Sequence, residues 1–269
     1  ETVEDAERVA ETLRERWNLG LAPIASVVGV LEDHLVHVLE IEANEKFDGI
    51  SAVAYDDEQR AVAAAVVARR GIAGERQRLN LAHELGHLVL DIPQNVDEER
   101  AAFRFGAAFL TPATVVYREV GERRAFIQAE ELLLFKRRFG MSIQALLYRL
   151  RDLGIITESY YRRWCMDINR LGWRRQEPLE FPPEQPQWLR RNVLRALAEG
   201  MLTREEAEGM LGEPVEMKQP LSLIERRAFM KLPLEERRRL LAEQAERMAA
   251  YYAQDMEWRE LGGGDLVEY

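Results

Sequence analysis

The chain has 269 residues, of which 47% are hydrophobic and 31% charged, and its formal net charge is -10 at pH 7. This balance is typical of a folded globular protein, and the acidic charge argues against direct nucleic-acid binding by this chain. Its single cysteine, Cys165, excludes an intramolecular disulfide framework and is typical of a reducing compartment. With no signal peptide and no apolar run long enough to span a bilayer, we expect a cytoplasmic protein without a membrane partner.

The first quarter of the chain predicts two helices followed by a small sheet. Apolar residues recur at helical spacing over residues 3–17, and Pro23 opens a shorter helix through residue 31. Segments rich in strand-forming residues follow, with turn chemistry between them, at 36–41, 51–55 and 60–67. We expect a mainly antiparallel three-stranded sheet, although the alanine-rich third segment is also compatible with a helix.

Residues 76–90 predict one amphipathic helix with two chemically different faces. Its apolar residues recur at helical spacing and would face a core. His83 and His87 lie four residues apart on another face, so both imidazoles can reach one zinc ion. Glu84 then lies beside the metal as a carboxylate free to act as a base. Gly86, in the middle of this helix, indicates a close approach of another backbone.

A His-Glu-x-x-His pattern also arises by chance, so a third ligand matters to its interpretation. Four acidic residues lie within reach, near the turn at Pro93, and they are Asp91, Asp97, Glu98 and Glu99. Helical phase does not choose among them. Asn95 is a suitable N-cap for the next helix, and Glu98 would be its capping-box partner.

Helices follow through most of the remaining chain. The next one is apolar on almost every side and stops before Pro112, and others are predicted at 128–139, 143–153, 158–171, 188–199, 203–211 and 233–252. Ser142 and Thr157 are the expected N-caps of the helices at 143–153 and 158–171. The helices at 143–153 and 158–171 are spaced like a helix-turn-helix, although such hairpins more often reflect plain packing. Prolines between 178 and 186 predict a linker. We therefore expect three parts, at residues 1–177, 178–219 and 220–269.

Several motifs in roughly the first 212 residues occur together. They are Arg16-Trp17-Asn18-Leu19-Gly20, Phe47-Asp48-Gly49-Ile50-Ser51, His83-Glu84-Leu85-Gly86-His87, the segment from Glu99 to Pro112, and Met141-Ser142-Ile143-Gln144-Ala145-Leu146. In this combination the chain resembles the cytoplasmic zinc metallopeptidases called ImmA/IrrE, or M78. The resemblance implies an α+β, predominantly helical fold with a zincin-like core, in which the sheet packs on the His-Glu-x-x-His helix and helical segments follow.

The same resemblance implies the site residues. Zinc would be bound by His83, His87 and Glu99, a gluzincin-like ligand set, and Glu84 would be the catalytic base. Phe103 stands where the family usually has asparagine, and residues 106–108 are less polar than is typical. Neither departure touches a ligand, but both concern the groups that support the ligands.

The last part of the chain resembles something else. The segments from Phe229 to Arg238, Glu257 to Glu260 and Gly264 to Tyr269 look like small antitoxins of bacterial toxin–antitoxin pairs. In such proteins a helix and an extended segment wrap a toxin, so residues 220–269 are a candidate toxin-binding tail. A solvated helix with a frayed end explains the same residues equally well.

The function implied is a zinc-dependent endopeptidase that hydrolyses a peptide bond in a repressor-like, DNA-binding regulator. Tyr117 is a candidate second donor to the developing oxyanion, and a strand edge would align the substrate by β-augmentation. The alternative is a non-catalytic zinc-containing regulatory or interaction protein, such as an antitoxin acting through its tail. Glu84 favours the enzyme, because a purely structural zinc site has no use for a free carboxylate there.

Overall fold

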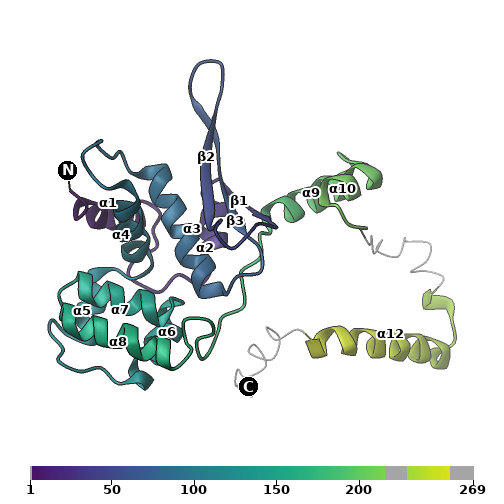
Figure 1. Ribbon diagram of the computed structural model, residues 1–269. Coiled ribbons are helices and arrows are strands. Elements are labelled where there is room, and N and C mark those ends of the chain that lie inside the picture. Colours follow the sequence, from purple (N-terminus) through teal and green to yellow (C-terminus); the bar gives the residue numbers. More distant parts are fainter. Residues whose placement is uncertain (1, 216–228, 255–269) are drawn as a thin grey trace, which may run out of the picture. The chain divides into compact units, whose positions relative to one another are not determined.

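A computed structural model describes residues 2–215 and 229–254 (Figure 1). The chain divides into two compact units, Glu1–Leu211 and Gly212–Tyr269. The elements of the first unit, in chain order, are α1 (Asp5–Arg16), α2 (Val27–Asp33), β1 (Val36–Ile41), β2 (Gly49–Tyr55), β3 (Ala61–Arg69), α3 (Gly74–Val89), α4 (Glu98–Leu110), α5 (Ala113–Val120), α6 (Ala129–Phe139), α7 (Ile143–Asp152), α8 (Glu158–Arg170), α9 (Trp188–Ala198) and α10 (Arg204–Leu211). The predicted α+β class with a small sheet is confirmed.

The sheet is mixed, so the prediction of a mainly antiparallel sheet was wrong. Its strand order is β1-β3-β2, with β2 antiparallel to β3 and β1 parallel to β3. Val66 at the centre of β3 pairs with Val38 on one side and Ser51 on the other. The physical reason is the loop at residues 42–48, which carries the chain past β1 so that β2 joins the sheet on the far side of β3.

One hydrophobic core joins the sheet to α1–α4. Buried residues of β3, α3 and α4 meet in it, among them Val66, Leu81, Leu85, Phe105 and Phe109. Close packing of α3 on α4 depends on glycine. A Cβ at Gly86 would lie 3.2 Å from Ala102 Cα, and one at Gly106 would lie 3.0 Å from the backbone nitrogen of His83. The close approach expected at Gly86 is therefore present.

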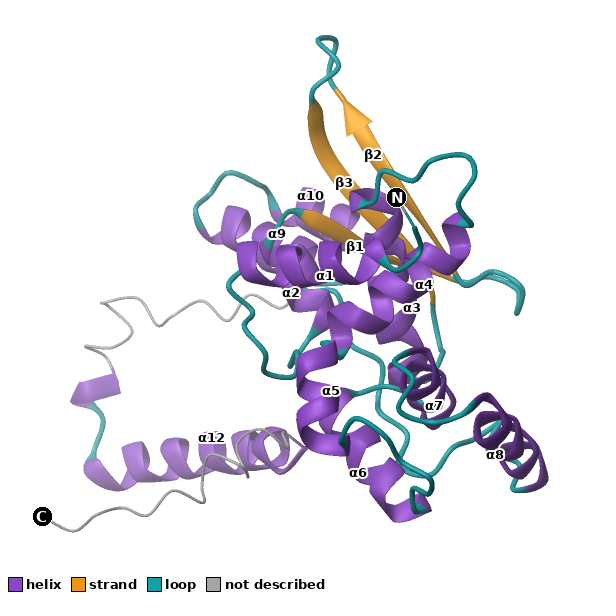
Figure 2. Cartoon of the chain, turned by 90° about the vertical axis from the view of Figure 1, so that its left-hand side faces the viewer, coloured by secondary structure: helices purple, strands orange, loops and turns teal. Residues whose placement is uncertain are grey.

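A second hydrophobic cluster holds α5–α8 together. Its buried members include Ile127, Leu132, Ile143 and Ile156. Figures 1 and 2 show α3 and α4 between the sheet and this helical group. The predicted caps are present, since Ser142 Oγ accepts a hydrogen bond from Ala145 N and Thr157 Oγ1 accepts one from Tyr160 N. Helix α5 was not predicted, and α2 begins after Ser26 rather than at Pro23 because the Ser26 side chain caps it.

The segment that joins α8 to α9, which we expected to be a linker, packs on the first turn of α3. Gly74 N donates to Phe181 O at 2.9 Å, and Phe181 N donates to Glu75 Oε2 at 3.0 Å. Further along, Gln77 Nε2 donates to Glu184 O at 2.8 Å, and Glu184 N donates to Gln77 Oε1 at 2.7 Å. We call residues 177–187 the strap, because they bind the start of the helix that carries both histidines.

The described part of the second unit contains α12 (Leu234–Gln254), close to the predicted range of 233–252. Much of the predicted antitoxin-like tail lies outside the described residues, at 220–228 and 255–269, so toxin binding stays a prediction. None of the helices in the described ranges is long and apolar enough to cross a membrane.

Candidate metal centre and cleft

The two histidines of α3 point their Nε2 atoms at the same spot. His83 and His87 are one turn apart, and their Nε2 atoms are 3.0 Å from each other. The ring centroids are 4.7 Å apart and nearly perpendicular. His83 is buried and His87 half-buried, so both imidazoles are held by their surroundings.

Glu99, in the first turn of α4, completes the cluster. Its carboxylate lies 3.4 Å from His83 Nε2 and 3.5 Å from His87 Nε2. Ligands about 2.0–2.2 Å from a tetrahedral zinc ion are about 3.3–3.5 Å apart, and the three separations agree with that spacing to within a few tenths of an ångström. Among the described residues this is the group of His, Cys, Asp and Glu side chains that could hold a metal ion.

Glu98 contacts the other ring nitrogen of His87. Its Oε1 lies 3.1 Å from His87 Nδ1, at hydrogen-bond distance for a donating Nδ1–H. A carboxylate in that position fixes the ring orientation and leaves Nε2 as the metal donor. The capping-box prediction for Asn95 and Glu98 was therefore wrong. Residues 93–96 form a turn, so α4 begins later, and Asp97 caps it by accepting from Arg100 N at 3.0 Å.

Glu84 lies between the two histidines in sequence but is not part of the donor cluster. Its side chain packs against β2, where a Cβ on Gly49 would come within 3.0 Å of Glu84 Oε1. Burial raises the pKa of the Glu84 carboxyl above its ordinary value, and a hydrogen bond with the Ser51 side chain opposes that shift. A carboxyl with a raised pKa is better matched to accepting and returning a proton near neutral pH.

The environment of His83 favours the neutral imidazole that a metal requires. Burial lowers the pKa of His83, and the charge of His87 lowers it further. The Phe103 ring lies over His83 with 4.2 Å between the ring centroids. The Nδ1 atom of His83 is buried and has no hydrogen-bond partner among the described residues. Phe103, noted above as a departure from the family, thus shields the ring but offers it no hydrogen bond.

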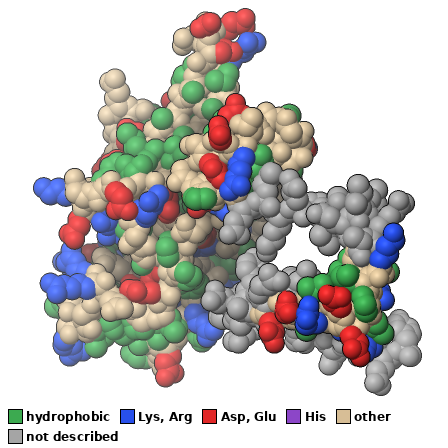
Figure 3. All heavy atoms as spheres, turned by 90° about the vertical axis from the view of Figure 1, so that its right-hand side faces the viewer, with side chains coloured by type: hydrophobic (Ala, Val, Ile, Leu, Met, Phe, Trp, Pro, Cys, Tyr) green, Lys and Arg blue, Asp and Glu red, His purple; other side chains and the backbone are tan. Residues whose placement is uncertain are grey.

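Strand β2 is an edge strand. It pairs with β3 on one side only within the described sheet, and its first residues are those that contact Glu84. Figure 3 shows acidic side chains gathered at the tip of the hairpin that β2 forms with β3, where Asp56, Asp57 and Glu58 form the turn. Charge at a strand end discourages non-specific edge pairing. Another strand could therefore pair with β2 mainly along the part near Glu84.

A cleft of about 900 Å³ opens beside the cluster. Glu99 and Phe103 line it at the metal-donor end, and Arg76, Leu79 and Asn80 of α3 line it further along. Further walls come from the end of β3, from α7 and α8, and from the residues after α8, and they include Arg69, Tyr148, Tyr161, Trp173, Arg174 and Arg175. A cleft of this size with a few polar groups is typical of a binding site.

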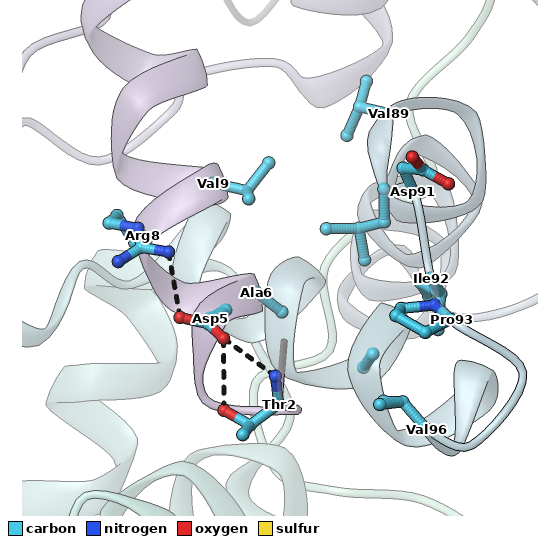
Figure 4. A pocket seen from close by; sticks show the side chains of 12 residues that line it. Thr2, Asp5, Ala6, Arg8, Val9, Val89, Asp91, Ile92, Pro93 and Val96 are labelled. Carbon is cyan, nitrogen blue, oxygen red and sulfur yellow. Dashed lines mark hydrogen bonds and ion pairs between the residues drawn. The ribbon is translucent and has the colours of Figure 1, made fainter.

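A smaller cavity, about 210 Å³, lies between α1 and the segment that follows His87 (Figure 4). Apolar side chains line it from both sides, including Val9, Val89 and Ile92. At its rim Asp5 accepts hydrogen bonds from Thr2 N at 2.8 Å and from the Arg8 side chain at 2.9 Å. Asp91, one of the four acidic residues considered as a third ligand, also lines this cavity and is not part of the donor cluster.

Sequence reasoning missed some site residues and misplaced one. Tyr117, the candidate oxyanion donor, does not line the cleft, and its hydroxyl donates to Leu153 O at 3.0 Å. Gly49 was named only as part of a motif and its turn, without a role at the site, whereas it makes room for Glu84. Glu98 was assigned to a cap. A carboxylate next to a predicted ligand is a signal that would have identified it.

Comparison with known proteins adds a family match. Residues 55–151, which include all the donor residues, match the Peptidase_M78 model, described as an IrrE N-terminal-like domain. No curated protein matches the chain. One solved structure, a "Mycobacterium tuberculosis transcriptional regulator", is 16% identical, with a TM-score of 0.39 over 56% of this chain and 47% of that chain. The chain thus spans about half the length of that protein, and a similarity this weak carries no argument.

Proposed function

We propose that this chain, whose residues 55–151 match the IrrE N-terminal-like family of M78 peptidases, is a zinc-dependent endopeptidase. The observation that carries the proposal is the division of roles among neighbouring side chains. His83, His87 and Glu99 converge on one point, while Glu84 stays out of that set and is buried against β2. A metal site of three protein donors with a free carboxylate beside it is the arrangement of hydrolytic zinc enzymes.

The donor set supports zinc in particular. Imidazole nitrogens and one carboxylate suit zinc better than they suit calcium or magnesium, which prefer oxygen ligands. Glu98 on His87 Nδ1 supports the same assignment, because it leaves Nε2 free to bind. When bound there, zinc supplies Lewis-acid polarisation of a carbonyl and makes water more acidic.

Glu84 is the proposed general base and acid. Its carboxylate takes a proton from the water that attacks the scissile carbonyl carbon, and it then gives that proton to the leaving amine nitrogen as the C–N bond breaks. Gly49 and Ser51 hold the side chain in place for both transfers. An extended substrate adds to β2 by main-chain hydrogen bonds, since one edge of that strand is open. The proposed substrate is a repressor-like regulatory protein.

The test separates chemistry from metal binding. Glu84→Gln should keep zinc at the wild-type stoichiometry but lose hydrolysis of a protein substrate, because only the base is removed. His83→Ala should lose both. Zinc content is measured after dialysis, and cleavage is followed by mass spectrometry with and without chelator. A Glu84→Gln protein that cleaves at the wild-type rate would rule out this role, and a zinc-loaded wild type that cleaves no protein or peptide would favour the non-catalytic regulatory alternative.

A further inference from the structure

Five arginines and six carboxylates line the cleft, and they are unevenly paired. Three of the six carboxylates are in ion pairs. Asp48 binds Arg76 at 2.5 Å, and Lys136 binds Glu75 at 2.5 Å and Glu177 at 2.9 Å. The remaining acids apart from Glu99 are Asp97 and Glu180.

Four arginines of the cleft make no ion pair within the described residues, and they are Arg69, Arg100, Arg174 and Arg175. The Nε atom of Arg69 is also buried without a hydrogen-bond partner there. A buried unpaired donor is costly and is stabilised when a ligand supplies an acceptor. These arginines are therefore the charged groups of the cleft that remain available to an anionic partner.

The unpaired arginines other than Arg100 lie toward the start of α3, away from the donor cluster. Arg69 ends β3 just before that helix, and Arg174 and Arg175 precede Glu177, which Lys136 joins to Glu75 in the first turn. We call Arg69, Arg174 and Arg175 the basic end. Glu75 precedes His83 by eight residues, which is about 12 Å along a helix axis.

The opposite end, next to the donors, is apolar. Phe103 lies over the His83 ring and is 46% exposed, although it is a large hydrophobic residue. Leu79 lies one turn before His83 on α3, and Ala107 lies one turn after Phe103 on α4, and both line the cleft. We call these three residues the apolar end. It is suited to a bulky apolar side chain close to the scissile bond.

We infer that the cleft selects peptide segments with a bulky apolar residue next to the scissile bond and an acidic residue three or four positions away. The spacing follows from the two ends of the cleft, since an extended peptide covers about 12 Å in three to four residues. Arg174 and Arg175 bind the acidic side chain, and the Trp173 ring lines the same end. This inference names a substrate class and rests on the proposed function, but binding alone is enough to test it.

The test uses the full chain, loaded with zinc, in its Glu84→Gln form so that a bound peptide is not consumed. The probes are fluorescein-labelled peptides of about twelve residues with one central leucine and a glutamate pair three and four positions to either side. Matched peptides carry lysine in place of glutamate, or glycine in place of leucine. Binding is measured by fluorescence anisotropy at low and raised salt.

The Leu/Glu peptide should bind tightest, and Arg174→Glu with Arg175→Glu should weaken it about tenfold, given the modest strength of exposed charge pairs. The lysine peptide should regain affinity in that variant, and raised salt should reduce both effects. The control is Arg162→Glu with Arg163→Glu, an equal charge change at an exposed pair of α8 outside the cleft lining, which should change affinity less than twofold.

Three results would each overturn the inference. The two double variants could have the same effect, the lysine peptide could bind wild type as well as the glutamate peptide does, or no peptide could bind at all. The proposed function fails separately. Suppose that the peptides bind with the expected charge preference, but the zinc-loaded wild type hydrolyses neither these peptides nor any protein. The inferred binding preference then holds, and the proposed endopeptidase activity is wrong.

Discussion

Replacing Glu98 by glutamine removes a charge next to the metal donors without removing a donor. Glu98 Oε1 lies 3.1 Å from His87 Nδ1, whereas the Glu99 carboxylate faces both Nε2 atoms. Carboxylates that orient a ligating histidine contribute about 10- to 100-fold to metal affinity. The Glu98 side chain is 65% exposed, so water competes for the same nitrogen. We therefore expect the lower limit, a loss of about tenfold, or about 1.4 kcal/mol.

The assay is competition for zinc against a chelator of known affinity. Glu99→Gln should weaken zinc binding much more than Glu98→Gln, because it changes a direct donor. The matched control is Asp97→Ala, which removes the helix cap and should cost about 1 kcal/mol of stability with zinc affinity unchanged. Zinc affinity in Glu98→Gln equal to that of wild type would refute the orienting role. Affinity as low as in Glu99→Gln would mean that the two glutamates have exchanged roles.

Two further predictions concern stability. Gly106→Ala places a Cβ 3.0 Å from His83 N, against backbone that cannot move aside, and should lower the free energy of unfolding by about 1–3 kcal/mol. The control Gly209→Ala, with open space around it, should raise that free energy by about 0.5–1 kcal/mol. If both variants change the melting temperature equally, the packing argument is wrong. For Glu7, burial raises the pKa, but the hydrogen bond and charge of Arg149, together with Arg104, outweigh it and the net pKa is lowered. The contribution of Glu7 to stability is therefore present above its unfolded pKa of about 4.3 and is lost as pH falls through the folded pKa. Urea unfolding at pH 7 should show wild type to be more stable than Glu7→Gln. A difference in stability that does not narrow at pH 3 would contradict this.

Sequence periodicity predicted the parts of the fold that depend on local chemistry. The helix with His83 and His87 was expected at 76–90 and lies at Gly74–Val89, and the serine and threonine caps of α7 and α8 are at the predicted residues. The three strands lie within two residues of the predicted limits. Propensity, caps and turns are properties of neighbouring residues, so they are readable from one chain.

Long-range arrangement was not readable in the same way. Strand order depends on which side of β3 the 42–48 loop takes β2 to, and no local pattern specifies that choice. The two candidate glutamates differ by one position, or about 100° around a helix. Which one faces the histidines depends on where α4 begins, and that start moved from Asn95 to Asp97 because residues 93–96 form a turn. Prolines correctly indicated an absence of regular structure after α8, but they do not indicate an absence of contacts.

The strap shows why the donor helix depends on residues far from it in sequence. The first N–H groups of a helix lack partners within it, and at α3 the strap supplies one of them, since Phe181 O accepts from Gly74 N. Lys136 is fully buried between Glu75 and Glu177, and removing one partner of a buried ion pair leaves an uncompensated charge. The strap lies outside the matched residues 55–151. Contacts made by residues on both sides of the matched segment therefore hold α3, and with it His83 and His87. Strand β1 precedes that segment and the strap follows it.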